Sequence, residues 1–165
     1  FASRSAMDID GLWPATVEAL LKAGYLKNIA DIYYLKEHRE SLIQSNESAK
    51  SSKSNKVRST DNLLRAVERS KENDIDRLLT GLGIPNVGRL AANILKQNFP
   101  DLPAVAAASF DQLIALNGLG ETMAKAIIDY FAQPVNQELL KRLAAAGVNL
   151  ESKAYQHQLM TGWAK

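Results

Sequence analysis

Apolar side chains recur at helical spacing along almost the whole chain. In residues 74–82, for example, Ile75, Leu78, Leu79 and Leu82 fall on one side of a helix. The same spacing predicts helices over residues 14–23, 30–40, 60–71, 74–82, 89–99, 110–116, 121–131 and 136–146. Alternation over five or more residues is missing and β-branched residues are sparse. The sequence therefore predicts an all-α fold.

Two segments are too polar to bury. Residues 45–56 read SNESAKSSKSNK and combine serine and lysine with a single alanine, which predicts a flexible loop. Residues 149–165 mix Ser, Gln, His and Gly, and they predict a linker toward a following module.

A turn followed by a helix recurs along the chain. The four turns are expected at residues 9–13, 54–58, 84–88 and 117–120. The pattern is sharpest at 116–127, an apolar–x–Gly–apolar–Gly sequence followed by Ala and Ile at helical spacing, and residues 82–94 hold a second copy. Recurrence at this interval indicates stacked units of supersecondary structure.

The glycines of the sharpest turn indicate an anion site. Gly118 and Gly120 are both expected to adopt positive φ, and Leu119 between them should anchor the turn in the core. Gly120 stands just before a helix, so free backbone N–H groups point outward there and the helix dipole adds positive potential. Such a site fits a phosphate and binds DNA without reading bases. The alternative is that the glycines only permit a tight turn.

A nucleotide-binding loop does not fit the same residues. Met123 stands where a dinucleotide fingerprint needs Gly or Ala, no strand precedes the turn, and the chain has no Walker A sequence.

Composition narrows the chemistry further. The chain has no cysteine, and its two histidines, His38 and His157, lie far apart, which excludes disulfides and a His/Cys zinc site. No long apolar run predicts a transmembrane helix. The net charge of +2 is mild for a dedicated nucleic-acid binder, so charge alone does not decide the function.

Four segments resemble the helix-hairpin-helix (HhH) domain of bacterial NAD-dependent DNA ligases. Residues 1–12 (FASRSAMDIDGL) are similar to the segment after that family's four-Cys zinc finger. Residues 78–88 (LLTGLGIPNVG) resemble its third hairpin, and residues 116–131 its fourth. Residues 136–148 resemble the helix that closes the domain before a C-terminal BRCT module.

This resemblance implies four HhH units in two pairs, a RuvA domain 2-like arrangement over residues 1–71 and 72–148, with 149–165 as a linker. It implies binding of nicked duplex DNA through minor-groove phosphates, in an enzyme that seals nicks in DNA replication and repair. It also implies a monomer in the bacterial cytoplasm at the nucleoid, without a membrane role, whose other partners are domains of the same ligase chain.

The chemical step is expected elsewhere in such a ligase. Adenylation in the family needs a Lys-x-Asp-Gly sequence, and the only Asp-Gly here is Asp10-Gly11, with Asp8 in the lysine position. The chain alone is therefore predicted to be inactive, with no catalytic residue, cofactor or metal of its own, and it begins as a fragment would, without Met. NAD, Mg and Zn are implied for the parent ligase.

The residues predicted to contact DNA come from all four turns. They are Gly11, Lys56, Arg58, Gly83, Asn86, Gly88, Arg89, Gly118, Gly120, Thr122 and Lys125.

Two of the turns depart from the family pattern. Trp13 stands where the first hairpin usually has its second glycine, although Pro14 suits a first helical position. In the second hairpin the expected glycine falls near Lys56. That hairpin is either a solvated loop or a phosphate site formed by charged side chains alone, namely those of Lys50, Lys53, Lys56 and Arg58. Residues 83–125 are therefore expected to contribute most of the binding.

Three other functions remain open at this point. A base-excision glycosylase or lyase would have a catalytic lysine close behind the hairpin, but Glu121 and Thr122 follow Gly120, and Lys125 comes one turn later. A non-enzymatic HhH adaptor of a recombination or excision-repair complex would bind DNA in the same way. A helical protein–protein module fits the mild charge but leaves the repeated glycine turns unexplained.

Overall fold

The computed structural model describes residues 1–45 and 52–162, which form α-helices and one 3-10 helix. Within these residues the only β contact is an isolated bridge between Asp101 and Glu151, so the predicted all-α fold is confirmed. In the same part of the chain, no helix is both long and apolar enough to cross a membrane.

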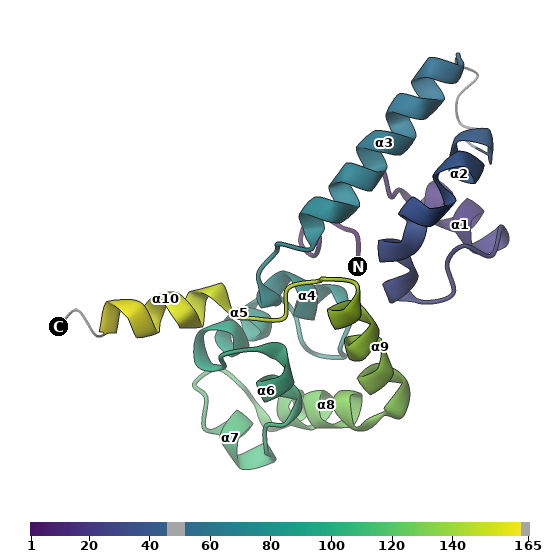
Figure 1. The fold of residues 1–165 in the computed structure, drawn as a ribbon. Coiled ribbons are helices and arrows are strands. Elements are labelled where there is room, and N and C mark those ends of the chain that lie inside the picture. Colours follow the sequence, from purple (N-terminus) through teal and green to yellow (C-terminus); the bar gives the residue numbers. More distant parts are fainter. Residues whose placement is uncertain (46–51, 163–165) are drawn as a thin grey trace.

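The helices form two groups (Figure 1). The first group holds α1 (Pro14–Lys22), the 3-10 helix η1 (Ile29–His38), α2 (Arg39–Ser45) and α3 (Lys53–Ser70). The second group holds α4 (Ile75–Gly81), α5 (Arg89–Asn98), α6 (Leu102–Ala106), α7 (Phe110–Ile114), α8 (Glu121–Ala132) and α9 (Pro134–Ala145). A last helix, α10 (Lys153–Gly162), projects from the second group and packs against α5.

One hydrophobic core runs through both groups. Its fully buried members include Leu35 of η1, Leu79 of α4, Leu95 of α5, Ile127 of α8 and Leu143 of α9. These residues lie at the apolar positions whose helical spacing predicted the elements.

Helix α6 was not predicted, although α7, which is equally short, was. Asp101 caps α6 by accepting a hydrogen bond from the N–H of Ala104 at 2.7 Å, and Leu102 and Val105 are buried. Packing of these two side chains against helices that are distant in the sequence, such as α8, stabilises α6.

The prediction of a loose segment over 45–56 is wrong for residues 53–56. Helix α3 begins at Lys53, with Ser52 at the N-cap, so Lys56 and Arg58 lie within its first two turns. The turn predicted at 54–58 is therefore also wrong. The amphipathic part of α3, which buries Leu63, Ala66 and Val67, provides the nucleus, and extension over polar residues adds one hydrogen bond per residue fixed. Ser45 is the last residue of α2, and residues 46–51 of the predicted loop, including Lys50, lie outside the described residues.

The segment after Asn149, predicted as the start of a linker, is fixed to the second group. The N–H of Asn149 donates to the carbonyl of Lys71 at 2.8 Å. Ser152 is buried and donates its hydroxyl to the carbonyl of Lys96 at 2.5 Å. These contacts order the chain up to the start of α10, while a module beyond it remains a prediction.

The N-terminal segment joins the two groups. Arg77 of α4 donates to the carbonyls of Arg4 and Ala6 at 2.8 and 3.0 Å, and Asn73 donates to the carbonyl of Met7 at 2.8 Å. Residues 1–7 thus pack where α3 ends and α4 begins.

Candidate nucleic-acid interface

Three turns of the chain share one backbone geometry. In each, the N–H of an apolar residue donates to the carbonyl three residues earlier: Leu12 to Ile9 at 3.3 Å, Val87 to Ile84 at 3.1 Å, and Leu119 to Leu116 at 3.1 Å. The residue before the apolar one has positive φ, which is 91° at Gly11, 64° at Asn86 and 93° at Gly118. Positive φ at this position is the requirement of a type II turn.

The apolar residue of each turn is an anchor. Leu12, Val87 and Leu119 are all buried and belong to the core. The expectation that Leu119 holds its turn in the core is therefore confirmed, and the other two turns are held in the same way.

A helix begins directly after each anchor. The N-cap residues are Trp13 for α1, Gly88 for α5 and Gly120 for α8, and all three have extended backbone. No side chain caps these helices, whereas Asp74, Asp101 and Ser109 accept hydrogen bonds from the first turns of α4, α6 and α7. The first N–H groups of α5 and α8 therefore remain open to an external acceptor.

The fold does not require glycine at the N-caps of α5 and α8. Gly120 was expected to have positive φ, and this is wrong: its φ is −83°. Gly88 has φ −98°, which other residues also adopt. A Cβ added to either glycine would have no heavy atom within 4 Å. Neither backbone strain nor packing explains why these two residues lack a side chain.

Gly118 lacks a side chain for a different reason. Its φ is +93°, and a Cβ there would lie 2.9 Å from Cδ1 of Ile94 on α5. This glycine is needed for the turn, because positive φ strains a residue with a Cβ, and the end of the Ile94 side chain would also have to shift.

The polar side chains predicted beside the hairpins are accessible. Arg89 is the first residue of α5, and Thr122 and Lys125 lie in the first turns of α8; all three are exposed. Within the described residues neither Arg89 nor Lys125 forms an ion pair. Their charges are available to an external anion.

The remaining predicted residues lie in other settings. Gly83, with φ +69°, follows the C-cap residue of α4 and lies three residues before Asn86. Lys56 and Arg58 lie on α3, where Arg58 is exposed and Lys56 is partly buried. These residues are not part of the turn geometry that Asn86, Gly118 and Gly11 share.

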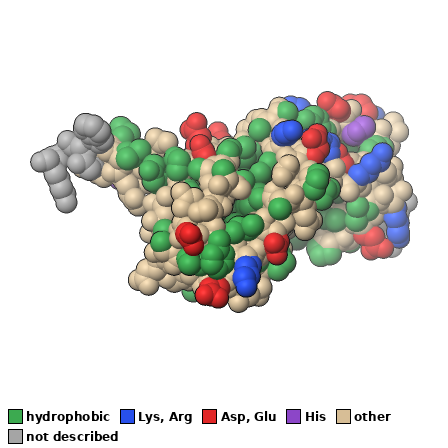
Figure 2. Space-filling view, turned by 90° about the horizontal axis from the view of Figure 1, so that it is seen from below, with side chains coloured by type: hydrophobic (Ala, Val, Ile, Leu, Met, Phe, Trp, Pro, Cys, Tyr) green, Lys and Arg blue, Asp and Glu red, His purple; other side chains and the backbone are tan. Residues whose placement is uncertain are grey.

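Charged side chains do not form one basic patch on the face seen in Figure 2. Blue and red side chains are scattered there among green and tan ones. On this face, a phosphate would be attracted by a few placed cations rather than by a broad positive surface.

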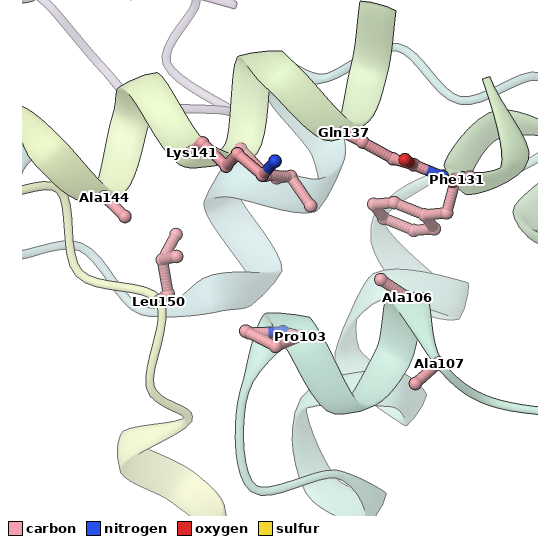
Figure 3. Close-up of a pocket in the computed structure, with 9 residues that line it drawn as sticks. Pro103, Ala106, Ala107, Phe131, Gln137, Lys141, Ala144 and Leu150 are labelled. Carbon is pink, nitrogen blue, oxygen red and sulfur yellow. Dashed lines mark hydrogen bonds between the residues drawn. The ribbon is translucent and has the colours of Figure 1, made fainter. Parts of the chain in front are cut away.

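One hollow of the described residues is apolar. It has a volume of about 400 Å³ and lies among α6, α8, α9 and Leu150, with Gln137 and Lys141 as its polar side chains (Figure 3). The described residues hold no group of three His, Cys, Asp or Glu side chains that could bind a metal ion. The hollow therefore offers only an amide and an ammonium group as polar side chains.

Comparison with known protein families gives a match within the second group of helices. A family model described as "Helix-hairpin-helix motif" matches residues 77–140, which span α4 to α9 and contain the turns at Asn86 and Gly118.

The relatives of the chain are longer proteins named DNA ligase. One from Clostridium kluyveri is 45% identical over 159 residues, 96% of this chain and 23% of the relative. Others, from Acetivibrio thermocellus and Brevibacillus brevis, are 43% and 40% identical over 92% and 93% of this chain. The chain therefore spans less than a quarter of the length of these relatives and is homologous to one segment of them.

Proposed function

We propose that this chain binds duplex DNA by its phosphates, without sequence preference, as the helix-hairpin-helix part of an NAD-dependent DNA ligase. The observation that carries the proposal is the pair Gly88 and Gly120. Each begins a helix with uncapped N–H groups, and each leaves open space where a side chain could stand without strain. A close-fitting ligand accounts for the missing side chains.

The chemistry of this site favours a phosphate. Uncapped N–H groups at a helix N-terminus donate to oxygen anions, and the helix dipole adds to the attraction. Arg89 and Lys125 supply two cations close behind the N-caps. Two such hairpins in one unit could hold two phosphates of one duplex, and contacts of this kind carry no sequence information.

The finer parts of the proposal come from the likeness to DNA ligases. We propose that the duplex is held along its minor groove at a nick, and that the parent enzyme seals nicks in DNA replication and repair in the cytoplasm. The parent would act as a monomer, and its other domains would contact this one. The chain alone would not join DNA.

The four-Cys zinc site of such a ligase has no cysteine ligand in this chain. The described residues hold no metal-binding cluster. We therefore propose that NAD, Mg and Zn are bound by other parts of the parent.

The test is a titration of dye-labelled duplexes of unrelated sequence with the 165-residue chain, followed by fluorescence anisotropy. Affinities should differ less than a few-fold among sequences. The logarithm of the binding constant should fall with the logarithm of salt concentration by about 0.9 for each phosphate held. Strong preference for one sequence, or binding that does not respond to salt, would contradict the proposal.

A further inference from the structure

The first turn of the chain has the geometry of the other two but a different chemistry. Gly11 matches Gly118 in φ, Leu12 matches Leu119 in burial, and the same hydrogen bond closes both turns. Trp13 then occupies the N-cap, where the other turns have Gly88 and Gly120.

This first turn is a poor phosphate site. Pro14 at the first helical position has no N–H, so α1 offers one donor fewer than α5 or α8. The hollow beside the turn is lined by two carboxylates, Asp8 and Asp10, together with Arg69 and Arg77. These formal charges cancel, so the hollow adds no net positive charge to attract a phosphate.

Trp13 is not explained by the packing of the chain. Its side chain is 61% exposed, and within residues 1–45 and 52–162 its indole makes no hydrogen bond or ring contact. A large aromatic side chain held by a rigid turn loses little conformational freedom when it binds a ligand. It offers a flat apolar face at the position where the other hairpins offer backbone N–H groups.

We infer that Trp13 contacts the same duplex through its ring, against the sugars and base edges, and that the first hairpin binds by apolar contact rather than by phosphate capture. This inference rests on the proposed function. It assigns the three hairpins two modes: the third and fourth provide the salt-dependent part of the affinity, and the first provides a part that salt does not weaken.

The salt dependence of binding distinguishes the two modes. Trp13→Ala should weaken duplex binding about tenfold at every salt concentration and leave the salt slope unchanged, because no counterion is released at an apolar contact. Trp13→Phe, which keeps a ring, should retain most of the affinity. Leu21→Ala is the matched control, because Leu21 is also large, apolar and 53% exposed on α1 but lies away from its N-terminus. The Leu21→Ala variant should bind duplex DNA with the affinity of the unmodified 165-residue chain.

Fluorescence gives an independent measure of the same contact. In a Trp163→Phe background, Trp13 is the only tryptophan of the chain. Its emission should change when unlabelled duplex is added, and the bound duplex should protect it from acrylamide quenching.

The two proposals fail in different ways. If labelled duplex binds but Trp13 emission and the affinity of Trp13→Ala are both unchanged, the inference is overturned and the proposed function stands. A lowered salt slope in Trp13→Ala overturns it too, because the residue would then act on a phosphate contact. If no duplex binds to the parent chain at all, the proposed function itself is overturned.

Discussion

Arg142 of α9 and Asp31 of η1 form an ion pair that joins the two groups of helices. Nη2 of Arg142 lies 2.6 Å from Oδ1 of Asp31. The other carboxylate oxygen accepts hydrogen bonds from the N–H groups of Lys27 and Asn28, at 2.8 and 3.1 Å. One side chain therefore caps η1 and holds α9, and it adds to the contacts of residues 1–7 and of the core that join the two groups.

Removal of the arginine should destabilise the chain. The side chains of Arg142 and Asp31 are 34% and 19% exposed, so the pair lies between a surface pair and a buried one. Arg142→Ala should lower the free energy of unfolding by about 1–2 kcal/mol, measured by urea titration, because Asp31 is left without its partner. Lys22→Ala removes an exposed pair with Glu18 and should have no measurable effect. Equal stability of both variants would contradict a role for the ion pair.

The same carboxylate should make stability depend on pH. Burial raises the pKa of Asp31, but hydrogen bonds from Arg142, Lys27 and Asn28 outweigh it and hold the pKa below its ordinary value of 3.8. As pH falls, the unfolded carboxyl takes up its proton first. The stabilisation is therefore complete above the ordinary value and is lost as pH falls from there through the lower folded pKa.

Comparison of the parent chain with Asp31→Asn tests this dependence. The difference in unfolding free energy should be constant near neutral pH and should shrink as pH falls below about 3.8. A difference that stays constant at acid pH would mean that Asp31 acts through something other than its charge.

Gly118 should matter for folding in a way that Gly120 does not. Gly118→Ala places a Cβ at φ +93° and 2.9 Å from Cδ1 of Ile94, so thermal or urea unfolding should show a loss of about 1–3 kcal/mol. Ile94→Val removes that carbon and should recover part of the loss in the double variant. Gly120→Ala should unfold like the parent chain. If both alanine variants lose the same stability, the distinction between the two glycines is wrong.

The cations behind the hairpins should contribute through salt-dependent contacts. Arg89→Ala and Lys125→Ala should each weaken duplex binding modestly and reduce the salt slope by about one. The control is the triple change of Lys50, Lys53 and Lys56 to Ala, which should have less effect, because Lys53 and Lys56 lie on α3 and not behind one of the three turns. Loss of binding in the triple variant alone would reverse the ranking of the hairpins.

Most helices were predictable, because each buries one face and its apolar spacing is local information. The turns at Gly11 and Gly118 were predictable for the same reason, since positive φ selects glycine. Asn86 was predicted as a DNA contact, but its positive φ was not predicted, although asparagine is one of the few residues other than glycine that tolerate positive φ.

Two features depended on information that is not local. The conformation of Gly120 could not be predicted, because a glycine that leaves room for a ligand looks the same in sequence as one that bends the chain. The ordering of Asn149 and Ser152 depends on carbonyls of Lys71 and Lys96, far away in the sequence. Such contacts leave no periodic pattern.

The most direct test of the account is duplex binding by a Gly88→Ala/Gly120→Ala double variant. The control is Gln133→Ala at the N-cap of α9, which also has no side-chain cap but does not follow a closed turn of this kind. The double variant should fold and unfold like the parent chain. Its affinity for duplex DNA should fall about tenfold for each hairpin, and its salt slope should be smaller, because each added methyl group displaces a phosphate from the N–H groups. Unchanged affinity in a folded double variant would contradict the claim that these two glycines are where the chain holds DNA.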